Sequence, residues 1–156
     1  MNLHRGQKVE NMNHMETMIR KLRTTLLAAA LAGSAGLALA HGDVTPQAVD
    51  VSTLKALGSD WLVENPYRGD KEAIRVGDSA FNQNCARCHG LGAISGGIAP
   101  DLRFLEHTAD ADEYFIGRVR NGVTRNGAVY MPPFEGTLPQ EARWAIRAWL
   151  ETVYEQ

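Results

Sequence analysis

The residues best suited to chemistry lie in one short run, Cys85-Ala86-Arg87-Cys88-His89. On a helix, residues three and four positions apart share a face, so both thiols and the imidazole can reach one bound group. Thiols can add to the two vinyl groups of a porphyrin, and imidazole is a good ligand for iron. The spacing therefore predicts covalent attachment of one haem through Cys85 and Cys88, with His89 as an iron ligand.

A structural zinc site and a redox-active dithiol are two other common uses of closely spaced cysteines. A structural zinc site usually takes four Cys or His ligands, and Cys85 and Cys88 are the only cysteines among the 156 residues. A thioredoxin-like dithiol lies in a βαβ context, and the chain shows no such pattern. The motif therefore favours haem attachment over both alternatives.

A second iron ligand is expected among the few other residues with suitable atoms. Met131 is the only methionine after residue 40, and it precedes two prolines, which keep the chain extended and exclude a helix. A thioether on such a loop can reach the iron face opposite His89, which gives the His/Met ligand pair of electron-transfer haem proteins. The alternatives are that Met131 fills a gap in the core, or that His107 or His41 is the sixth ligand.

A glycine-rich loop, residues 96–102, lies between the motif and the methionine. A metal-bound histidine needs an acceptor for its other ring N–H, and a backbone carbonyl of this loop is a suitable candidate. Gly96 and Gly97 allow the backbone to approach the ring edge, although the loop is also compatible with an ordinary surface turn. Arg87 and Arg103 are candidates for contacts with the haem propionates, and solvation is the alternative for each.

Residues 1–40 have the pattern of a secretory leader. Residues 20–23 carry three basic side chains, an apolar run follows, and Ala38-Leu39-Ala40 fits a cleavage site. The run is short for a membrane span and consists mainly of Ala and Gly, so we expect a cleaved signal peptide, with an uncleaved anchor as the alternative. After cleavage we expect no membrane insertion and a mature chain of 116 residues.

This mature chain is small and acidic. It has 11 Lys and Arg against 16 Asp and Glu, a net charge of −5 before any propionates are added. Its size suits one domain with one core. A basic surface is not indicated, so we expect no nucleic-acid partner.

Three helices are expected around the haem, and no run shows the alternation of a strand. The first spans residues 72–85, where Gly77 and Phe81 share one face. Because glycine weakens a helix by about 1 kcal/mol, Gly77 indicates close approach of another helix. The second spans residues 110–120, with acidic residues near its start and an Asn-Gly stop.

The third helix begins at a predicted capping box formed by Thr137 and Gln140, and its apolar stripe continues to Val153. Trp149 lies in this stripe and is the expected aromatic partner of Phe81. The stripe alone indicates only a buried face; the haem motif is what makes this particular pairing plausible.

Residues 41–73 form an N-terminal extension of irregular character. The Gly, Asn and Pro content of this segment favours turns. We expect Trp61, Leu62 and Tyr67 to cover part of the domain, and a propionate contact from Trp61 or Tyr67 is the alternative to plain packing.

Taken together, these motifs resemble those of class I cytochromes c. The motifs that carry the resemblance are the haem motif, Ala99-Pro100-Asp101-Leu102, Met131-Pro132-Pro133-Phe134, and the Gly77, Phe81 and Trp149 set. It covers about residues 74–153 and implies an all-α fold packed around one covalent haem. It also implies His89 and Met131 as axial ligands, with the Pro100 carbonyl directed toward His89. Residues 74–156 are then the cytochrome c domain.

A narrower resemblance points to the soluble cytochromes c that serve PQQ-dependent (quinoprotein) ethanol dehydrogenases. The segments that carry it are residues 41–47, 64–68 and 82–93. This family implies a periplasmic protein with a quinoprotein alcohol dehydrogenase as electron donor. An oxidase or another cytochrome is then the electron acceptor.

The function favoured by these observations is that of a one-electron carrier rather than an enzyme. Two fixed iron ligands and a covalent ring limit rearrangement between the redox states. A haem enzyme would need an open iron position and polar distal groups, and occupation of that position by Met131 argues against it. The remaining alternative is a gas-binding sensor in which Met131 is displaceable.

Overall fold

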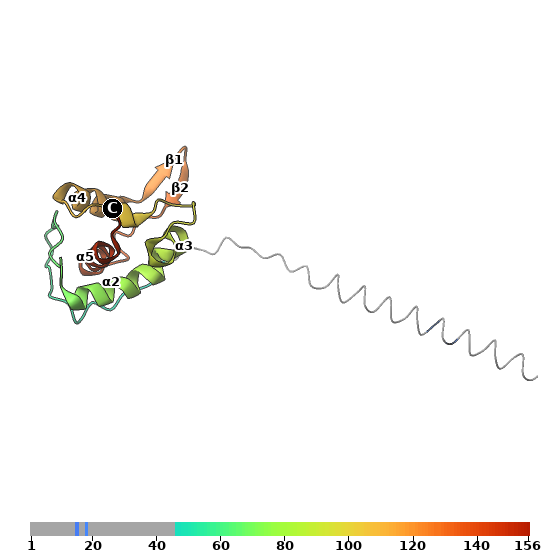
Figure 1. The fold of residues 1–156 in the computed structure, drawn as a ribbon, viewed down its shortest axis with the longest axis horizontal. Helices are drawn as coiled ribbons and strands as arrows, with labels where there is room; N and C mark the ends of the chain where they lie inside the picture. The colour runs from blue at the N-terminus through green and yellow to red at the C-terminus, as the bar shows by residue number, and fades with distance from the viewer. Residues whose placement is uncertain (1–14, 16–17, 19–45) are drawn as a thin grey trace, which may run out of the picture. The chain divides into compact units, whose positions relative to one another are not determined.

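The structure is a computed structural model that describes Met15, Met18 and residues 46–156 (Figure 1). The predicted cleavage site and His41 lie outside the described residues. Residues 46–156 belong to one compact unit. Its elements are α2 (Lys71–Asn84), α3 (Ala86–His89), η1 (Leu91–Ala93), η2 (Leu102–Phe104), α4 (Ala109–Asn121), β1 (Val123–Arg125), β2 (Ala128–Met131), α5 (Gln140–Leu150) and η3 (Glu151–Val153). No helix in the described part is long and apolar enough to cross a membrane.

Helix α2 begins at a side-chain cap and buries one face. The Asp70 carboxylate accepts hydrogen bonds from the backbone N–H groups of Glu72 and Ala73, at 2.9 and 3.0 Å. Such a cap satisfies donors that the first turn leaves without partners. The buried face includes Gly77 and Phe81, and the helix lies within one residue of the predicted boundaries at each end.

Helices α2 and α5 pack against each other, side by side in Figure 1. A Cβ atom added at Gly77 would lie 1.9 Å from the carbonyl oxygen of Ala145, so only glycine allows this approach. Beyond the contact, the rings of Phe81 and Trp149 lie with their centroids 4.5 Å apart. The predicted helix approach at Gly77 and the Phe81–Trp149 pair are both confirmed.

The start of α5 differs from the prediction. The helix begins at Gln140, and Pro139 occupies the cap position without a side-chain hydrogen bond. The Thr137 hydroxyl instead donates to the Phe134 carbonyl, at 3.0 Å. The predicted capping box was therefore wrong, because the Gln140 side-chain oxygen accepts from the backbone N–H of Leu62, at 2.9 Å, and is engaged by the N-terminal extension.

Helix α4 crosses the same core. The Thr108 hydroxyl caps its start, and Gly122, with a φ of 67°, follows its last residue, so the predicted Asn-Gly stop is confirmed. The buried Asp112 carboxylate accepts from Arg147 Nε at 2.7 Å and from Arg68 Nη2 at 2.8 Å. This ion pair network joins α4, α5 and the extension, and removing one buried partner of such a pair typically costs about 3–5 kcal/mol.

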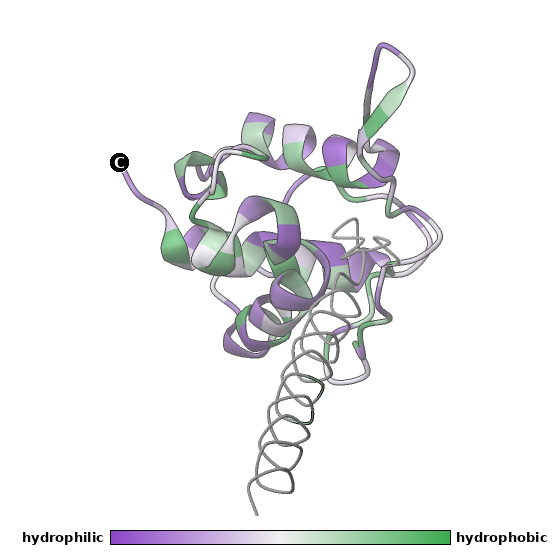
Figure 2. Ribbon diagram, turned by 90° about the vertical axis from the view of Figure 1, so that its right-hand side faces the viewer, coloured by the Kyte–Doolittle hydropathy of each residue, from purple (hydrophilic) through white to green (hydrophobic). Residues whose placement is uncertain are grey.

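A β-hairpin follows α4, and the expectation that no strand would form was wrong. Strands β1 and β2 pair antiparallel, with Thr124 opposite Val129. Asn126 and Gly127 both have positive φ, 51° and 79°, as the tight two-residue turn of a hairpin requires. Figures 1 and 2 both show this hairpin projecting beyond the helices. The fold is otherwise helix-dominated, as predicted.

The described part of the N-terminal extension packs on the helices. The backbone N–H groups of Leu57 and Leu62 donate to side chains of α5, each at 2.9 Å. Tyr67 is buried, and Trp61 and Leu62 are partly buried against the core. The expected packing of these three residues is therefore confirmed.

We predict that Gly77→Ala destabilises the protein strongly. The added methyl group would collide with the Ala145 carbonyl, so the helices must separate, and such overpacking costs at least about 1–3 kcal/mol. Thermal unfolding of the haem-loaded protein measures the loss. The neighbouring exposed substitution Asp78→Ala is the control and should leave the melting temperature nearly unchanged; equal melting temperatures for both variants would contradict the close contact.

Candidate haem-attachment site

The Cys-x-x-Cys-His motif lies on a short helix at the end of α2. The backbone bends at Cys85, with φ −117° and ψ −35°, and α3 continues with a hydrogen bond from the His89 N–H to the Cys85 carbonyl at 3.0 Å. Gly90 then adopts a φ of 81°, and a Cβ there would lie 1.8 Å from the Ile94 carbonyl oxygen. The chain therefore turns sharply directly after the histidine.

His89 is oriented by the loop that follows. Its Nδ1 atom lies 2.8 Å from the carbonyl oxygen of Pro100. Because a carbonyl can only accept, Nδ1 carries the proton and Nε2 is left with a free lone pair. This is the arrangement of a histidine prepared for metal ligation through Nε2.

An ion pair holds the Pro100 segment in place. Asp101 accepts from Arg103 Nε at 3.1 Å and from Arg103 Nη2 at 2.9 Å, and it also caps the backbone N–H of Arg103. Hydrogen bonding to Arg103 lowers the pKa of the Asp101 carboxyl to about 2. Since that pKa lies below its unfolded value near 4, the contact is fully present above pH 4 and is lost only as pH falls toward 2.

Met131 is placed by α4 and the hairpin. It is half-buried at the end of β2, opposite Val123. A Cβ at Gly122 would lie 2.4 Å from the Met131 carbonyl oxygen, so the methionine backbone crosses directly over the end of α4. Three residues later, the N–H of Phe134 donates to the Val119 carbonyl at 2.9 Å. The segment is therefore fixed by backbone contacts on both sides.

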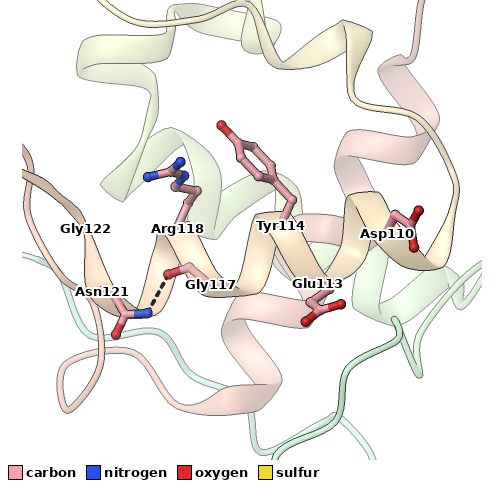
Figure 3. Close-up of a pocket in the computed structure, with 7 residues that line it drawn as sticks. All are labelled: Asp110, Glu113, Tyr114, Gly117, Arg118, Asn121 and Gly122. Atoms are coloured by element: carbon pink, nitrogen blue, oxygen red, sulfur yellow. Dashed lines mark hydrogen bonds between the residues drawn. The ribbon is translucent and has the colours of Figure 1, made fainter.

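One open cavity of about 500 Å³ lies along α4 and reaches Gly122, next to the methionine segment. Its lining residues are Asp110, Glu113, Tyr114, Gly117, Arg118, Asn121 and Gly122. Figure 3 shows Tyr114 and Arg118 projecting from the same side of α4, and the Arg118 guanidinium lies 5.0 Å from the centre of the Tyr114 ring. Tyr114 is more than half exposed.

The donor set fits a covalently bound haem. Two half-buried thiols, one oriented imidazole and one thioether are present, and the loop after the motif exposes the apolar side chains of Leu91, Ile94 and Ile98. Burial, with a smaller contribution from Cys88, raises the pKa of the Cys85 thiol to about 12. Residues 46–156 also bring together no group of three or more His, Cys, Asp or Glu suited to a metal ion.

Other predicted candidates have different contacts. His107 is exposed, and its ring centroid lies 4.7 Å from that of Tyr154. Arg103 pairs with Asp101, as described above, and with Glu155. Trp61 contacts two guanidinium groups. The sequence did not predict that Gly122 lets the Met131 backbone pass the end of α4, although the helix stop at Asn121-Gly122 was predicted.

Comparisons with known proteins found similar sequences over most of the chain. Residues 72–150 match the family model described as "Cytochrome C oxidase, cbb3-type, subunit III". The chain is 57% identical to cytochrome c550 of Pseudomonas aeruginosa, over 85% of this chain and 94% of that protein. It is 30% identical to cytochrome c-L of Methylorubrum extorquens, over 86% of this chain and 77% of that protein.

A third relative is larger. Half of the chain (51%) is 36% identical to a segment that makes up 11% of the quinohemoprotein alcohol dehydrogenase ADH IIB of Pseudomonas putida. The matches to cytochrome c550 and cytochrome c-L extend over most of the chain. The chain therefore belongs to the cytochrome c family and is an electron carrier with covalently bound haem c.

Proposed function

We propose that this cytochrome c accepts single electrons from a PQQ-dependent alcohol dehydrogenase, with ethanol as substrate of that enzyme, and passes them to a terminal oxidase or another cytochrome. Cys85 and Cys88 form the thioether links, and His89 and Met131 are the axial ligands. The 2.8 Å contact between His89 Nδ1 and the Pro100 carbonyl carries the ligand assignment, and the similarity to a segment of a quinohemoprotein alcohol dehydrogenase carries the choice of donor. The predicted signal peptide supports a periplasmic location.

The protein contributes a rigid ligand frame. When bound, the haem supplies a reversible one-electron couple between Fe(III) and Fe(II). The Pro100 carbonyl fixes the ring orientation of His89, and Gly122 fixes the path of Met131 through a backbone contact. Ligands held in this way need little rearrangement when the charge on the iron changes, which suits a carrier.

The exposed surface beside the motif supports docking without a ring of lysines. Leu91, Ile94 and Ile98 are more than half exposed. Lys55 and Lys71 are the only lysines after residue 40, and the expected mature chain has a net charge of −5. Docking should therefore rest on apolar contacts with a polar rim, while charge mainly tunes the encounter rate. Similarity to a segment of a quinohemoprotein alcohol dehydrogenase supports this class of donor.

The first prediction concerns attachment. Replacing Cys85 and Cys88 together by serine should abolish covalent haem, because a hydroxyl does not form the thioether. The protein should also fold poorly, since the haem fills the centre of a small core. Haem staining of a denaturing gel measures this, with the exposed Gln83→Ala variant as control. Haem staining that persists in the double variant would show that the attachment sites are wrong.

The second prediction concerns the sixth ligand. Met131→Ala should open the iron position, lower the reduction potential and allow the reduced protein to bind carbon monoxide, which the parent protein should not bind at neutral pH. Optical spectra and a redox titration measure both effects. If Met131→Ala has the same spectrum and reduction potential as the parent, His107 or His41 is the sixth ligand instead. If the parent itself binds carbon monoxide, a gas sensor or haem enzyme is favoured.

The third prediction concerns the donor. Mixing purified quinoprotein ethanol dehydrogenase, ethanol and the oxidised cytochrome should reduce the haem rapidly, and omission of any one component should prevent it. Because charge mainly tunes the encounter and salt screens charge, added salt should change the rate of haem reduction without abolishing it. Reduction no faster than that of an unrelated acidic cytochrome would leave a periplasmic carrier with a different donor.

A further inference from the structure

Trp61 of the N-terminal extension contacts two positively charged side chains. The Arg120 guanidinium lies 3.8 Å from the centre of its ring, and that of Arg143 lies 4.2 Å away. Both distances are within the range of a cation–π interaction, and tryptophan is the aromatic residue that makes the strongest ones. One side chain therefore connects the extension to α4 and α5 at the same point.

Arg120 in turn holds the segment that carries Met131. Its Nη2 atom lies 2.8 Å from Glu135 Oε1, and its carbonyl oxygen accepts from the Glu135 N–H at 3.4 Å. The preceding residue, Phe134, donates its N–H to Val119. The chain four residues beyond Met131 is thus attached to the last turn of α4 by side chain and backbone together.

The buried guanidinium group of Arg143 depends on its contact with the Trp61 ring. Arg143 is buried, and its Nη1 atom has no hydrogen-bond partner within the described part of the chain. Burial lowers the pKa of Arg143, with the Glu135 carboxylate opposing the shift and the Arg120 charge adding to it. The face of the Trp61 ring lies against both guanidinium groups, which repel each other. Without the ring, the buried charge of Arg143 would lose a favourable contact. Arg143 would then compete with Arg120 for the Glu135 carboxylate.

We propose that Trp61 is a positioning residue for the sixth iron ligand, acting through Arg120 and Glu135 on the segment that carries Met131. The proposal rests on the proposed His89/Met131 ligation. The extension then does more than cover the core: it sets how readily the thioether leaves the iron. Removing the aromatic ring raises the fraction of molecules in which an external ligand can replace Met131.

The experiment compares Trp61→Leu and Trp61→Phe in the haem-loaded mature protein. Leucine keeps apolar bulk without an aromatic face, and phenylalanine restores the face. The affinity of the oxidised protein for imidazole should rise roughly 3-fold to 30-fold in Trp61→Leu, the span expected for loss of a cation–π contact, and return close to the parent value in Trp61→Phe. Hydrogen exchange at the amides of Phe134 and Glu135 should accelerate in parallel.

Leu57→Ala is the matched control, because Leu57 is a half-buried residue of the same extension whose backbone N–H donates to Glu141 instead of the Arg120–Glu135 pair. It should lower the melting temperature without changing imidazole affinity. Unchanged imidazole affinity and amide exchange in Trp61→Leu would overturn the proposal. Met131→Ala distinguishes failure of the proposed His89/Met131 ligation from failure of the role of Trp61. If the parent protein binds imidazole as tightly as Met131→Ala, the proposed ligation is wrong. If Met131→Ala binds imidazole more tightly than the parent and Trp61→Leu does not, only the role of Trp61 is wrong.

Discussion

Helix α2 touches α5 backbone to backbone at Gly77, and the rest of the site depends on that contact. No other residue fits, because a Cβ there would lie 1.9 Å from the Ala145 carbonyl oxygen. The approach brings Phe81 against Trp149, with ring centroids 4.5 Å apart, one turn before Cys85. The core therefore determines where α2 ends, and the thiols that follow are presented at a fixed place.

From this end of α2, backbone contacts position both candidate iron ligands. A turn at Gly90 brings the Pro100 carbonyl within 2.8 Å of His89 Nδ1, and the Asp101–Arg103 pair stabilises the loop. On the other side, Gly122 lets the backbone of Met131 cross the end of α4. Positions set by the main chain change little with side-chain motion, so the proposed ligand geometry should be the same in both redox states.

Local patterns in the sequence predicted the parts of this fold that local physics determines. The helical spacing of Gly77, Phe81 and the haem motif depends on neighbours three or four residues away. The hairpin escaped prediction because its strands have only three and four residues, although Asn126-Gly127 is a typical turn signal. The failed capping box at Gln140 and the place of Trp61 depend on partners about 60–80 residues distant, which no local pattern contains.

The central claim, that this carrier holds its iron between His89 and Met131, can be tested on one nucleus. Met131 is the only methionine after residue 40, so a protein of residues 41–156 labelled with ¹³C-methyl methionine should give a single methyl signal. If the thioether binds the iron, the porphyrin ring current should move that signal in the reduced protein far outside the range of ordinary methionine methyl groups. A signal within the ordinary range would contradict the account.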